Sequence, residues 1–364
     1  ARVDVPAMDV SAMDGYAVAG DIPPGERRPV AGTIAAGSPP GFSLVPPAVA
    51  RIMTGAPVPL DADRVIQVEQ SETHGADRSE VSFREPGSPG QHIRRQGEIQ
   101  RAGSELLPRG ALLTPGALSL LATHGYGTLP VHRAPRVAFL TTGDEVVPPE
   151  SEPAPGQLRD SHTDFLLAAG ASLDLSFTPL GHAPDREAAL LPLIERGLSS
   201  DVLILCGGVS KGEFDLVEGV LAQLGCQAVF DSVAIQPGQP LVFAVHEREG
   251  QRGFVFGLPG NPASVMVTFW LFVRPALRCL AGKPDAFWDH ALAATTTLPL
   301  PAGGPRDRFF PAEIEIREGR IHATPTPFKG SHDLAAYAHG TALLRVRAGA
   351  PAAPAGGACE VLGL

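Results

Sequence analysis

The sequence predicts a multidomain α/β plus β protein, in which a central doubly wound, mostly parallel sheet is flanked by β-rich N-terminal and C-terminal domains. The chain has 364 residues, more than one ordinary hydrophobic core accommodates. Over residues 134–284, apolar runs alternate with capped helical segments, a pattern typical of a doubly wound sheet. On either side, short β-type runs lie between the many turns that 41 Gly and 37 Pro favour.

The first part of the chain divides into two expected regions. Residues 1–100 are expected to form the N-terminal β-rich domain, since they show no helical periodicity. Short β-type runs stand at Arg64–Val68 and Glu80–Phe83. Residues 101–133 are expected to form a helical or linker domain, because Thr114 and Pro115 suit the N-cap and first turn of a helix. A motif-like segment follows Ala1 almost at once, so we expect the chain to be trimmed at its N-terminus.

Residues 134–284 are expected to form the doubly wound domain. The expected strands are Arg136–Thr141, Leu173–Pro179, Asp201–Cys206 and Gly253–Leu258. The expected helices are one capped by Asp160 or Ser161 and ending at Gly170, one capped by Asp185 and ending at Gly197, one at Leu216–Leu224, and a long buried one that includes Val265–Leu280. Ligands bind such sheets beyond the carboxyl ends of the strands. Three polar loops follow strands here and close on Glu145, Asp215 and Asn261, so they form the candidate site.

Residues 285–364 are expected to form a C-terminal β-barrel-like domain. Glu313–Ile316 and Arg320–His322 flank a hairpin turn at Glu318-Gly319. Ala342–Val346 is expected to be the last strand.

Composition excludes several classes of protein. A net charge of −10 without a basic stripe argues against a nucleic-acid partner. No run of about 18 uncharged apolar residues occurs, which argues against a membrane span. The four cysteines form no CxxC pair, so a zinc site or disulfide framework is not indicated and a reducing cytoplasmic location is expected.

Two of the candidate loops carry carboxylates and glycines. Thr141–Glu145 places two carboxylates at a strand end, although capping or a solvated turn is favoured on motif grounds alone. Gly207–Asp215 contains three glycines that let backbone N–H groups approach an anion, whereas an ordinary turn explains only one glycine. Its spacing matches neither a Walker A loop nor a GxGxxG fingerprint. Asp215 suits a helix cap as well as a site.

The third loop, Leu258–Pro262, has two explanations. Asn261 is a natural N-cap and Pro262 a natural first helical residue, which accounts for both structurally. The same arrangement would aim a helix N-terminus at a phosphate. Composition leaves both explanations open.

The segment Ser11–Val18 resembles the signature of the molybdopterin molybdenumtransferases, a family that includes the bacterial insertases and the C-terminal domain of gephyrin. Further matching segments follow in family order at Arg51–Pro57, Ala62-Asp63, Glu69, Thr142–Glu145, Gly207–Ser210, Pro237-Gly238 and Leu258–Pro262. The resemblance covers essentially the whole chain.

This resemblance implies an elongated homodimer with four domains per chain and an active site shared between the two chains. It implies a transferase that inserts molybdate into adenylylated molybdopterin and releases AMP in an Mg²⁺-dependent step of molybdenum cofactor biosynthesis. It also allows contact with the molybdopterin adenylyltransferase. Whether the metal is molybdenum or tungsten stays open.

The resemblance also assigns residues. The catalytic positions fall on Asp14, Glu145 and Asp215, with Mg²⁺ held by Glu145 and Asp215; carboxylates are ligands that Mg²⁺ prefers. The substrate-binding positions fall on Thr54, Thr142, Gly143, Asp185, Gly207, Gly208, Ser210, Lys211, Gln236, Pro237, Gly238, Gln239, Pro259, Asn261 and Ser331. Among these, Thr54, Ser210 and Ser331 would donate hydrogen bonds to molybdate or phosphate oxygens.

Three positions depart from the family pattern. Ile99 stands where the family often has Asp, and Gln236 and Gln239 stand where it commonly has Lys. Glutamine donates hydrogen bonds but carries no charge, so two favourable Coulomb interactions with an anion are lost, and Lys211 in the neighbouring loop is a candidate to compensate.

Two alternative functions follow from these departures and from the middle domain. One is a catalytically impaired pterin-binding or scaffold paralogue. The other is an adenylyltransferase, whose fold resembles the middle domain alone. The Ser11–Val18 segment and the two β-domains argue against the adenylyltransferase.

Overall fold

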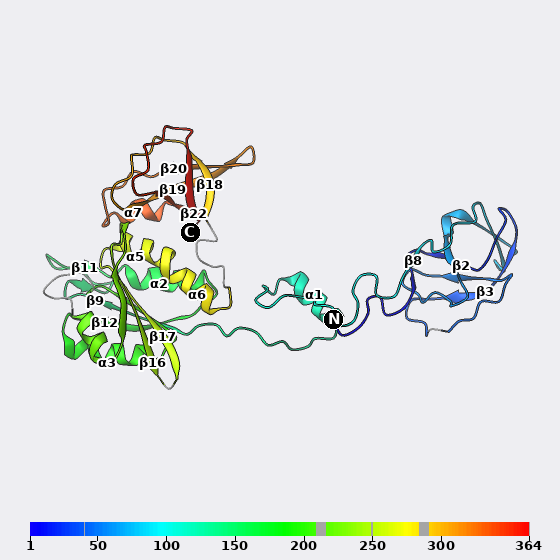
Figure 1. The fold of residues 1–364 in the computed structure, drawn as a ribbon, viewed down its shortest axis with the longest axis horizontal. Helices are drawn as coiled ribbons and strands as arrows, with labels where there is room; N and C mark the ends of the chain where they lie inside the picture. Colours follow the sequence, from blue (N-terminus) through cyan, green and yellow to red (C-terminus); the bar gives the residue numbers. More distant parts are fainter. Residues whose placement is uncertain (40, 209–215, 249, 284–290, 364) are drawn as a thin grey trace. The chain divides into compact units, whose positions relative to one another are not determined.

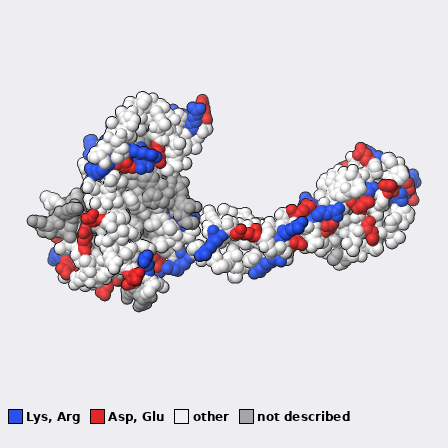
Figure 2. Space-filling view, viewed as in Figure 1, with Lys and Arg blue, Asp and Glu red and all other residues white. Residues whose placement is uncertain are grey.

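The computed structural model describes residues 1–39, 41–208, 216–248, 250–283 and 291–363 (Figure 1). The chain divides into two compact units, Ala1–Pro130 and Val131–Leu364. On the face displayed in Figure 2, the described Lys and Arg side chains are interspersed with Asp and Glu rather than gathered in one stripe.

The first unit is built mainly from strands, as expected. They are β1 (Val10–Ser11), β2 (Gly15–Val18), β3 (Arg28–Ile34), β4 (Val49–Ile52), β5 (Arg64–Gln67), β6 (Ser71–His74), β7 (Glu80–Phe83) and β8 (Ile93–Arg94), with a 3₁₀ turn at Val68–Gln70. Six form a sheet in the order β5-β2-β4-β3-β7-β6, and β1 pairs with β8. Alternate residues of β2 enter different cores: Ala17 packs with Ile52, whereas Tyr16 packs with Phe83.

Helix α1 (Pro115–Thr123) follows in the same unit. The Thr114 hydroxyl oxygen accepts a hydrogen bond from the Ala117 amide at 3.2 Å, and Pro115 opens the first turn. The predicted cap is therefore confirmed.

The second unit contains the doubly wound domain. Its main strands are β9 (Val137–Thr142), β12 (Phe177–Ala183), β13 (Val202–Cys206), β14 (Gln227–Ser232), β16 (Pro240–Arg248) and β17 (Gln251–Leu258), with a short parallel pair β10 (Val146–Val147) and β11 (Leu158–Arg159). The sheet order is β12-β9-β13-β17-β16-β14, in which β12, β9, β13 and β17 are parallel, and β16 and β14 are joined by antiparallel pairings. The mostly parallel sheet is confirmed.

Helices cover both faces of this sheet (Figure 1). They are α2 (His162–Ala171), α3 (Glu187–Gly197), α4 (Val217–Gln223), α5 (Pro262–Thr268) and α6 (Arg274–Leu280). Ala138 and Leu140 of β9 pack in one core with α3 and α4. Val137 and Phe139 pack in the other core with α2, α5 and α6. Because the sheet is buried on both faces, its central strands are apolar runs rather than alternating apolar and polar residues.

Two local predictions in this domain were wrong. The second strand lies at Phe177–Ala183 rather than Leu173–Pro179, because Leu173 and Leu175 close the turn after α2 through hydrogen bonds to the Gly170 carbonyl. Both leucines are apolar because they pack against the core beside α2. Asp185 does not cap α3: that helix begins at Glu187, with Arg186 at the N-cap position and no side-chain cap.

Asp160 and Ser161 were the alternative caps for α2. Ser161 occupies the N-cap position without a side-chain bond. The Asp160 carboxylate instead accepts hydrogen bonds from the amides of His162 and Thr163, at 2.8 and 3.1 Å. Asp160 therefore supplies the hydrogen-bond acceptor for two backbone amides in the first turn of α2.

The segment Pro262–Leu280 combines α5, a π-helical turn (Phe269–Val273) and α6. Its 19 residues are long and apolar enough to cross a membrane by length and composition alone. In this structure Val265 and Phe269 pack on the sheet, and Val267 and Leu271 pack on the C-terminal domain. Burial between two layers accounts for the composition, so the prediction of a buried helix is confirmed.

The C-terminal domain is a closed barrel. Its elements are β18 (Ala291–Thr296), β19 (Asp307–Arg317), β20 (Arg320–Pro325), α7 (Leu334–Ala338), β21 (Ala342–Val346) and β22 (Ala358–Gly363), and β15 (Ile235–Gln236) of the central domain joins it. The order β19-β20-β18-β22-β21 closes through β21–β19 pairing. Glu318 and Gly319 have φ of 49° and 75°, as the predicted hairpin turn requires.

The prediction that Ala342–Val346 is the last strand was wrong. β22 follows it and closes the barrel between β18 and β21. The sequence before β22 is rich in Ala, Gly and Pro, which hides the start of a further strand.

Asp201, just before β13, fastens the segment that enters the central domain. Its carboxylate accepts hydrogen bonds from the Arg133 guanidinium and, at 2.6 Å, from the Arg136 amide. The hydrogen bonds from Arg133 come first among the causes that lower the pKa of Asp201 to about 2, from an ordinary 3.8.

Asp201→Asn should lower the free energy of unfolding at pH 7 by about 1–2 kcal/mol, since the lowered pKa reports a folded state that favours the ionised carboxylate. Arg133 is 63% exposed, which keeps the effect below the full value. The loss should have its full size above about pH 5 and should shrink as the pH falls through 3.8 towards about 2. Urea unfolding of both proteins across this range measures it, with Glu195→Gln on α3 as an exposed control. A loss that does not change with pH would contradict this assignment.

Candidate functional site

The loops that follow β9, β12, β13 and β17 meet at one edge of the central sheet. The Gly143 amide donates to the Ala183 carbonyl at 3.3 Å, and the Gly207 amide donates to the Leu258 carbonyl at 3.1 Å. These bonds join the β9 loop to the end of β12 and the β13 loop to the end of β17. The candidate loops predicted from the sequence thus lie together.

Gly207 is required by the close approach of two loops. Its φ is +96°, and a Cβ atom there would lie 2.8 Å from both the carbonyl oxygen and the hydroxyl oxygen of Thr142. Because its N–H already donates to Leu258, Gly207 does not offer that amide to an anion, contrary to expectation. Gly208 continues the same turn with a φ of +65°.

Carboxylates gather where β9 and β12 end. The Asp185 amide donates to the Asp144 carboxylate at 3.3 Å. Burial, followed by the negative charges of Asp144 and Glu145, raises the pKa of Asp185 above its usual range. Burial and the neighbouring charges therefore oppose the ionisation of Asp185, and a nearby cation would relieve the repulsion.

Of the two residues predicted to hold the metal, the structure describes only one. Glu145 lies in this acidic loop, whereas Asp215, together with Ser210 and Lys211, lies outside the described residues. Within the parts of the chain that the structure describes, no three His, Cys, Asp or Glu side chains converge as a metal site.

A histidine that sequence reasoning missed braces the acidic loop. The His182 Nε2 lies 2.9 Å from the Gly143 carbonyl oxygen, and its Nδ1 lies 3.3 Å from the Thr141 hydroxyl. That hydroxyl donates to Asp160 at 3.2 Å. Nε2 must donate to the carbonyl, which fixes one proton of the ring. A lone His in a strand gives no sequence signal for this contact.

A second group of predicted residues lines a cavity of about 300 Å³ between the central domain and the barrel. We call it the inter-domain cavity. Its predicted lining residues are Gln236, Pro237, Gly238, Gln239, Pro259, Asn261 and Ser331. Ile235, Pro240, Gly260, Ser264, Arg306, Phe328 and Gly330 complete it. Two domains therefore contribute to one site.

The geometry separates the two explanations of Asn261. Asn261 occupies the N-cap position of α5, but its side chain makes no cap bond and is exposed beside the cavity. The carbonyl oxygen of Ser331 instead accepts the Ala263 amide at 3.1 Å. A barrel residue thus satisfies one N-terminal amide of the helix, which leaves the Asn261 side chain available to a ligand.

Arg306 is a second residue that sequence reasoning missed. Its guanidinium lines the inter-domain cavity and donates a hydrogen bond to the Gln239 side-chain oxygen. The charge that the Gln236–Pro240 loop lacks is thus present in the cavity, supplied by the segment before β19. That segment carries no motif, so only the fold reveals it.

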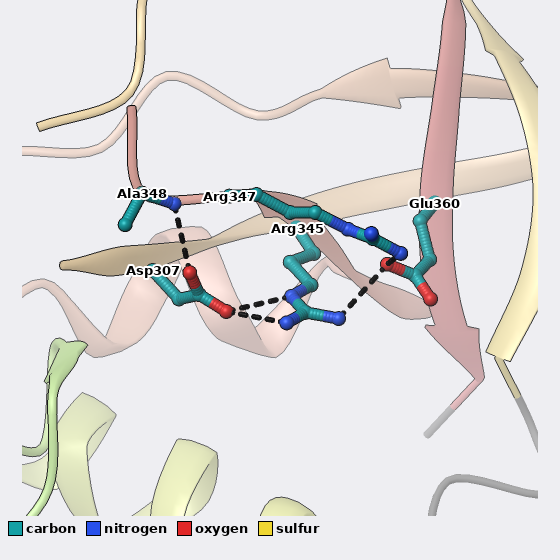
Figure 3. A network of polar contacts seen from close by, with 5 residues as sticks. All are labelled: Asp307, Arg345, Arg347, Ala348 and Glu360. Carbon is teal, nitrogen blue, oxygen red and sulfur yellow. Dashed lines mark hydrogen bonds and ion pairs between the residues drawn. The ribbon is translucent and has the colours of Figure 1, made fainter. Parts of the chain in front are cut away.

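An ionic network holds the start of β19 (Figure 3). The Asp307 carboxylate accepts hydrogen bonds from Arg345 at 2.6 and 2.8 Å and from the Ala348 amide at 2.8 Å, and Arg345 also donates to Glu360 at 3.1 Å. Burial acts to raise the pKa of Asp307, but these hydrogen bonds outweigh it and lower the pKa. Asp307 follows Arg306 directly, so this network fixes the backbone next to the arginine that lines the cavity.

The remaining predicted residues lie in the first unit. The amide and hydroxyl of Thr54 each donate to the Asp14 carboxylate at 2.7 Å, and these bonds lower the pKa of Asp14. Gly15 of β2 lies very close to the backbone of β5, since a Cβ atom there would be 2.1 Å from the Ile66 carbonyl oxygen. Thr54 thus donates to Asp14, whereas an anion was expected as its acceptor. Ile99, a departure from the family pattern, is exposed.

Comparisons with known protein families cover most of the chain. Residues 1–125 match the MoeA N-terminal region (domain I and II), residues 138–279 match a probable molybdopterin binding domain, and residues 293–364 match the MoeA C-terminal region (domain IV).

Curated relatives agree with these matches. Molybdopterin molybdenumtransferase 2 of Mycobacterium tuberculosis strain H37Rv is 35% identical, over 95% of this chain and 86% of the relative. The molybdopterin molybdenumtransferase of Synechococcus elongatus is 40% identical, over 76% of this chain and 70% of the relative.

Among solved structures, the molybdopterin biosynthesis MoeA protein of Pyrococcus horikoshii superposes with a TM-score of 0.80 at 31% identity, over 99% of this chain and 88% of that chain. The order of the three matched regions, the identity with curated relatives and the shared fold agree. The chain belongs to the MoeA family of molybdopterin molybdenumtransferases.

Proposed function

We propose that this protein is a molybdopterin molybdenumtransferase of molybdenum cofactor biosynthesis, which inserts molybdate into adenylylated molybdopterin and releases AMP. The inter-domain cavity carries this proposal, because it gathers polar side chains from two domains around one guanidinium. The curated relatives named for this activity support it.

Molybdate fits the inter-domain cavity chemically. It is a compact tetrahedral dianion, and Arg306, Asn261 and Ser331 offer N–H and O–H donors there. The Arg306 charge would supply the Coulomb attraction, while Gln239 holds its guanidinium in place.

The adenylate would lie over the ends of β9 and β12, where the acidic loop suits a divalent cation. Mg²⁺ would be held by Glu145 and Asp215, and when bound it would neutralise charge on the pyrophosphate. The raised pKa of Asp185 supports this choice, since clustered carboxylates attract a cation. His182 would keep the loop in place through the Gly143 carbonyl.

The site would be shared between two chains of a homodimer, with Asp14 supplied by one chain and Glu145 by the other. The Thr54 hydrogen bonds keep Asp14 oriented and ionised for this role. The enzyme would act in the cytoplasm, in agreement with four cysteines that form no disulfide. Contact with the molybdopterin adenylyltransferase would deliver the adenylylated substrate.

The second candidate function is a paralogue that binds the pterin without turning it over. The loss of lysines at Gln236 and Gln239 favours it, whereas Arg306 in the same cavity argues for retained anion binding. Mixing purified protein with adenylylated molybdopterin, Mg²⁺ and molybdate separates the two, since only the transferase releases AMP.

In this assay, Glu145→Gln should reduce AMP release by at least about a hundredfold, because the substitution removes a charge proposed to hold Mg²⁺. The fold should be retained, since Glu145 is exposed. Glu195→Gln, an exposed change on α3, is the matched control. Turnover of Glu145→Gln within a few-fold of wild type at saturating Mg²⁺ would remove this residue from the mechanism.

Arg306→Gln should weaken the molybdate dependence of the reaction, and Gln239→Lys should strengthen it, with both effects larger at low salt. A single charge beside a partly buried anion changes affinity by about tenfold. Varying molybdate at two ionic strengths measures both. If neither substitution shifts the molybdate dependence, molybdate binds elsewhere.

Subunit exchange tests the shared site. Asp14→Asn and Glu145→Gln are each expected to be inactive, but each randomly mixed dimer would hold one site with neither mutation. Activity should return to about a quarter of wild type, the statistical value for a two-fold dimer. If both residues belong to the same chain's site, exchange restores nothing.

A further inference from the structure

A second cavity, of about 440 Å³, adjoins the inter-domain cavity and belongs mainly to the barrel. Gln236, Phe328 and Gly330 line both, so the two are contiguous. We call the second one the barrel cavity. Its other lining residues are Leu298, Pro299, Arg308, Phe310, Pro325, Thr326 and Pro327. No residue expected to bind the substrate lies in it except Gln236.

The walls of the barrel cavity are flat and largely apolar. Phe310 and Phe328 meet edge to face with ring centroids 5.5 Å apart, and three prolines and Leu298 provide further flat surface. The Arg308 guanidinium stacks on Phe310, with its central carbon 4.9 Å from the ring centroid. Aromatic faces, proline rings and a stacked guanidinium together suit a planar heteroaromatic ring.

Arg308 is held in this orientation by its strand. It pairs with Gln236 of β15, and its neighbour Asp307 is anchored on the other side of β19 by Arg345 and the Ala348 amide (Figure 3). Arg306 and Arg308 flank the anchored Asp307 in the chain, and each lines one of the two contiguous cavities.

The arrangement of the candidate sites indicates which part of the substrate the barrel cavity would hold. The acidic loop touches Gly207 through Thr142, Gly207 lies beside Gly260, and Gly260 lines the inter-domain cavity. The barrel cavity shares Gln236, Phe328 and Gly330 with the inter-domain cavity, whereas Gly260 lines the inter-domain cavity alone. A substrate with its adenylate at the acidic loop and its dithiolene at the molybdate would have this contiguous cavity available for its pterin.

We propose that the barrel cavity binds the pterin ring of the substrate, with Arg308 stacked against it or hydrogen-bonded to its edge. This assignment rests on the proposed function for the identity of the ring. It makes Arg308 and the wall around Leu298 determinants of substrate binding.

The test is fluorescence titration of the full-length protein with free 6-hydroxymethylpterin, beside calorimetric titration with AMP. Arg308→Gln removes the cation. Leu298→Trp fills the cavity from a position that is 46% exposed, so the fold should tolerate it. Arg320→Gln, an exposed change at the far hairpin of the barrel, is the control.

Both cavity substitutions should raise the Kd for the pterin by about fivefold or more, as a lost cation–π contact or a blocked cavity predicts. The control should leave it unchanged, and the AMP affinity should stay the same in all variants. Wild type that binds no pterin, or cavity variants that bind it normally, would overturn the assignment. A loss of AMP affinity in these variants would place the nucleobase there and also overturn it.

Failure of the proposed function gives a different pattern. Pterin binding that depends on Arg308 and Leu298, without AMP release from adenylylated molybdopterin, would support the ring site and reject the transferase. AMP release by wild type, with an unchanged substrate KM in both cavity variants, would support the transferase and reject the ring site.

Discussion

The joint between the central domain and the barrel is the constraint on which the candidate site depends. Two residues of β15 pair with the start of β19, and the Asp307 amide donates to the Ala234 carbonyl. The outer side of the α5–α6 segment completes the joint, since Leu271 packs with Phe309 and Tyr337 of the barrel. Apolar burial over this contact fixes the two domains within one unit. Without it, the inter-domain cavity would have walls on one side only.

Charge is distributed along this joint in a way that suits the proposed substrate. Carboxylates stand at the ends of β9 and β12, where burial and then the charges of Asp144 and Glu145 raise the pKa of Asp185. Arg306 and Arg308 stand on the barrel side. A cation is therefore favoured at one end of the site and an anion in its middle. A protein with a net charge of −10 can bind an oxyanion only through such local groups.

The sequence predicted most of the architecture because burial on two faces leaves a strong pattern. The β9 and β13 runs are almost wholly apolar, Thr114 marks the start of α1, and Gly170 and Gly197 mark the ends of α2 and α3. The errors arose where apolar residues serve turns, as at Leu173 and Leu175, or where a strand is rich in small residues, as in β22. Local pattern does not distinguish an apolar side chain that closes a turn from one that lies in a strand.

The candidate site was predictable only where its residues stand in motifs. Gln236, Asn261 and Ser331 are far apart in the chain, and the structure brings them to one cavity. Arg306 and His182 were missed because their roles depend on what lies opposite them: Gln239 for one, the Gly143 carbonyl for the other. Such partners are set by domain packing rather than by sequence spacing.

The glutamines of the Gln236–Pro240 loop therefore do not by themselves imply a lost function. The electrostatic requirement of an anion site is a positive charge within a few ångströms, and the element that supplies it is free to vary. Here the guanidinium comes from the barrel and is held by the side chain that stands at a common lysine position, Gln239. A lysine at that position would add a second positive charge beside the anion, which outweighs the loss of the Arg306 hydrogen bond that an ammonium cannot accept. The glutamine and the arginine thus form one unit, in which the neutral side chain orients the charged one.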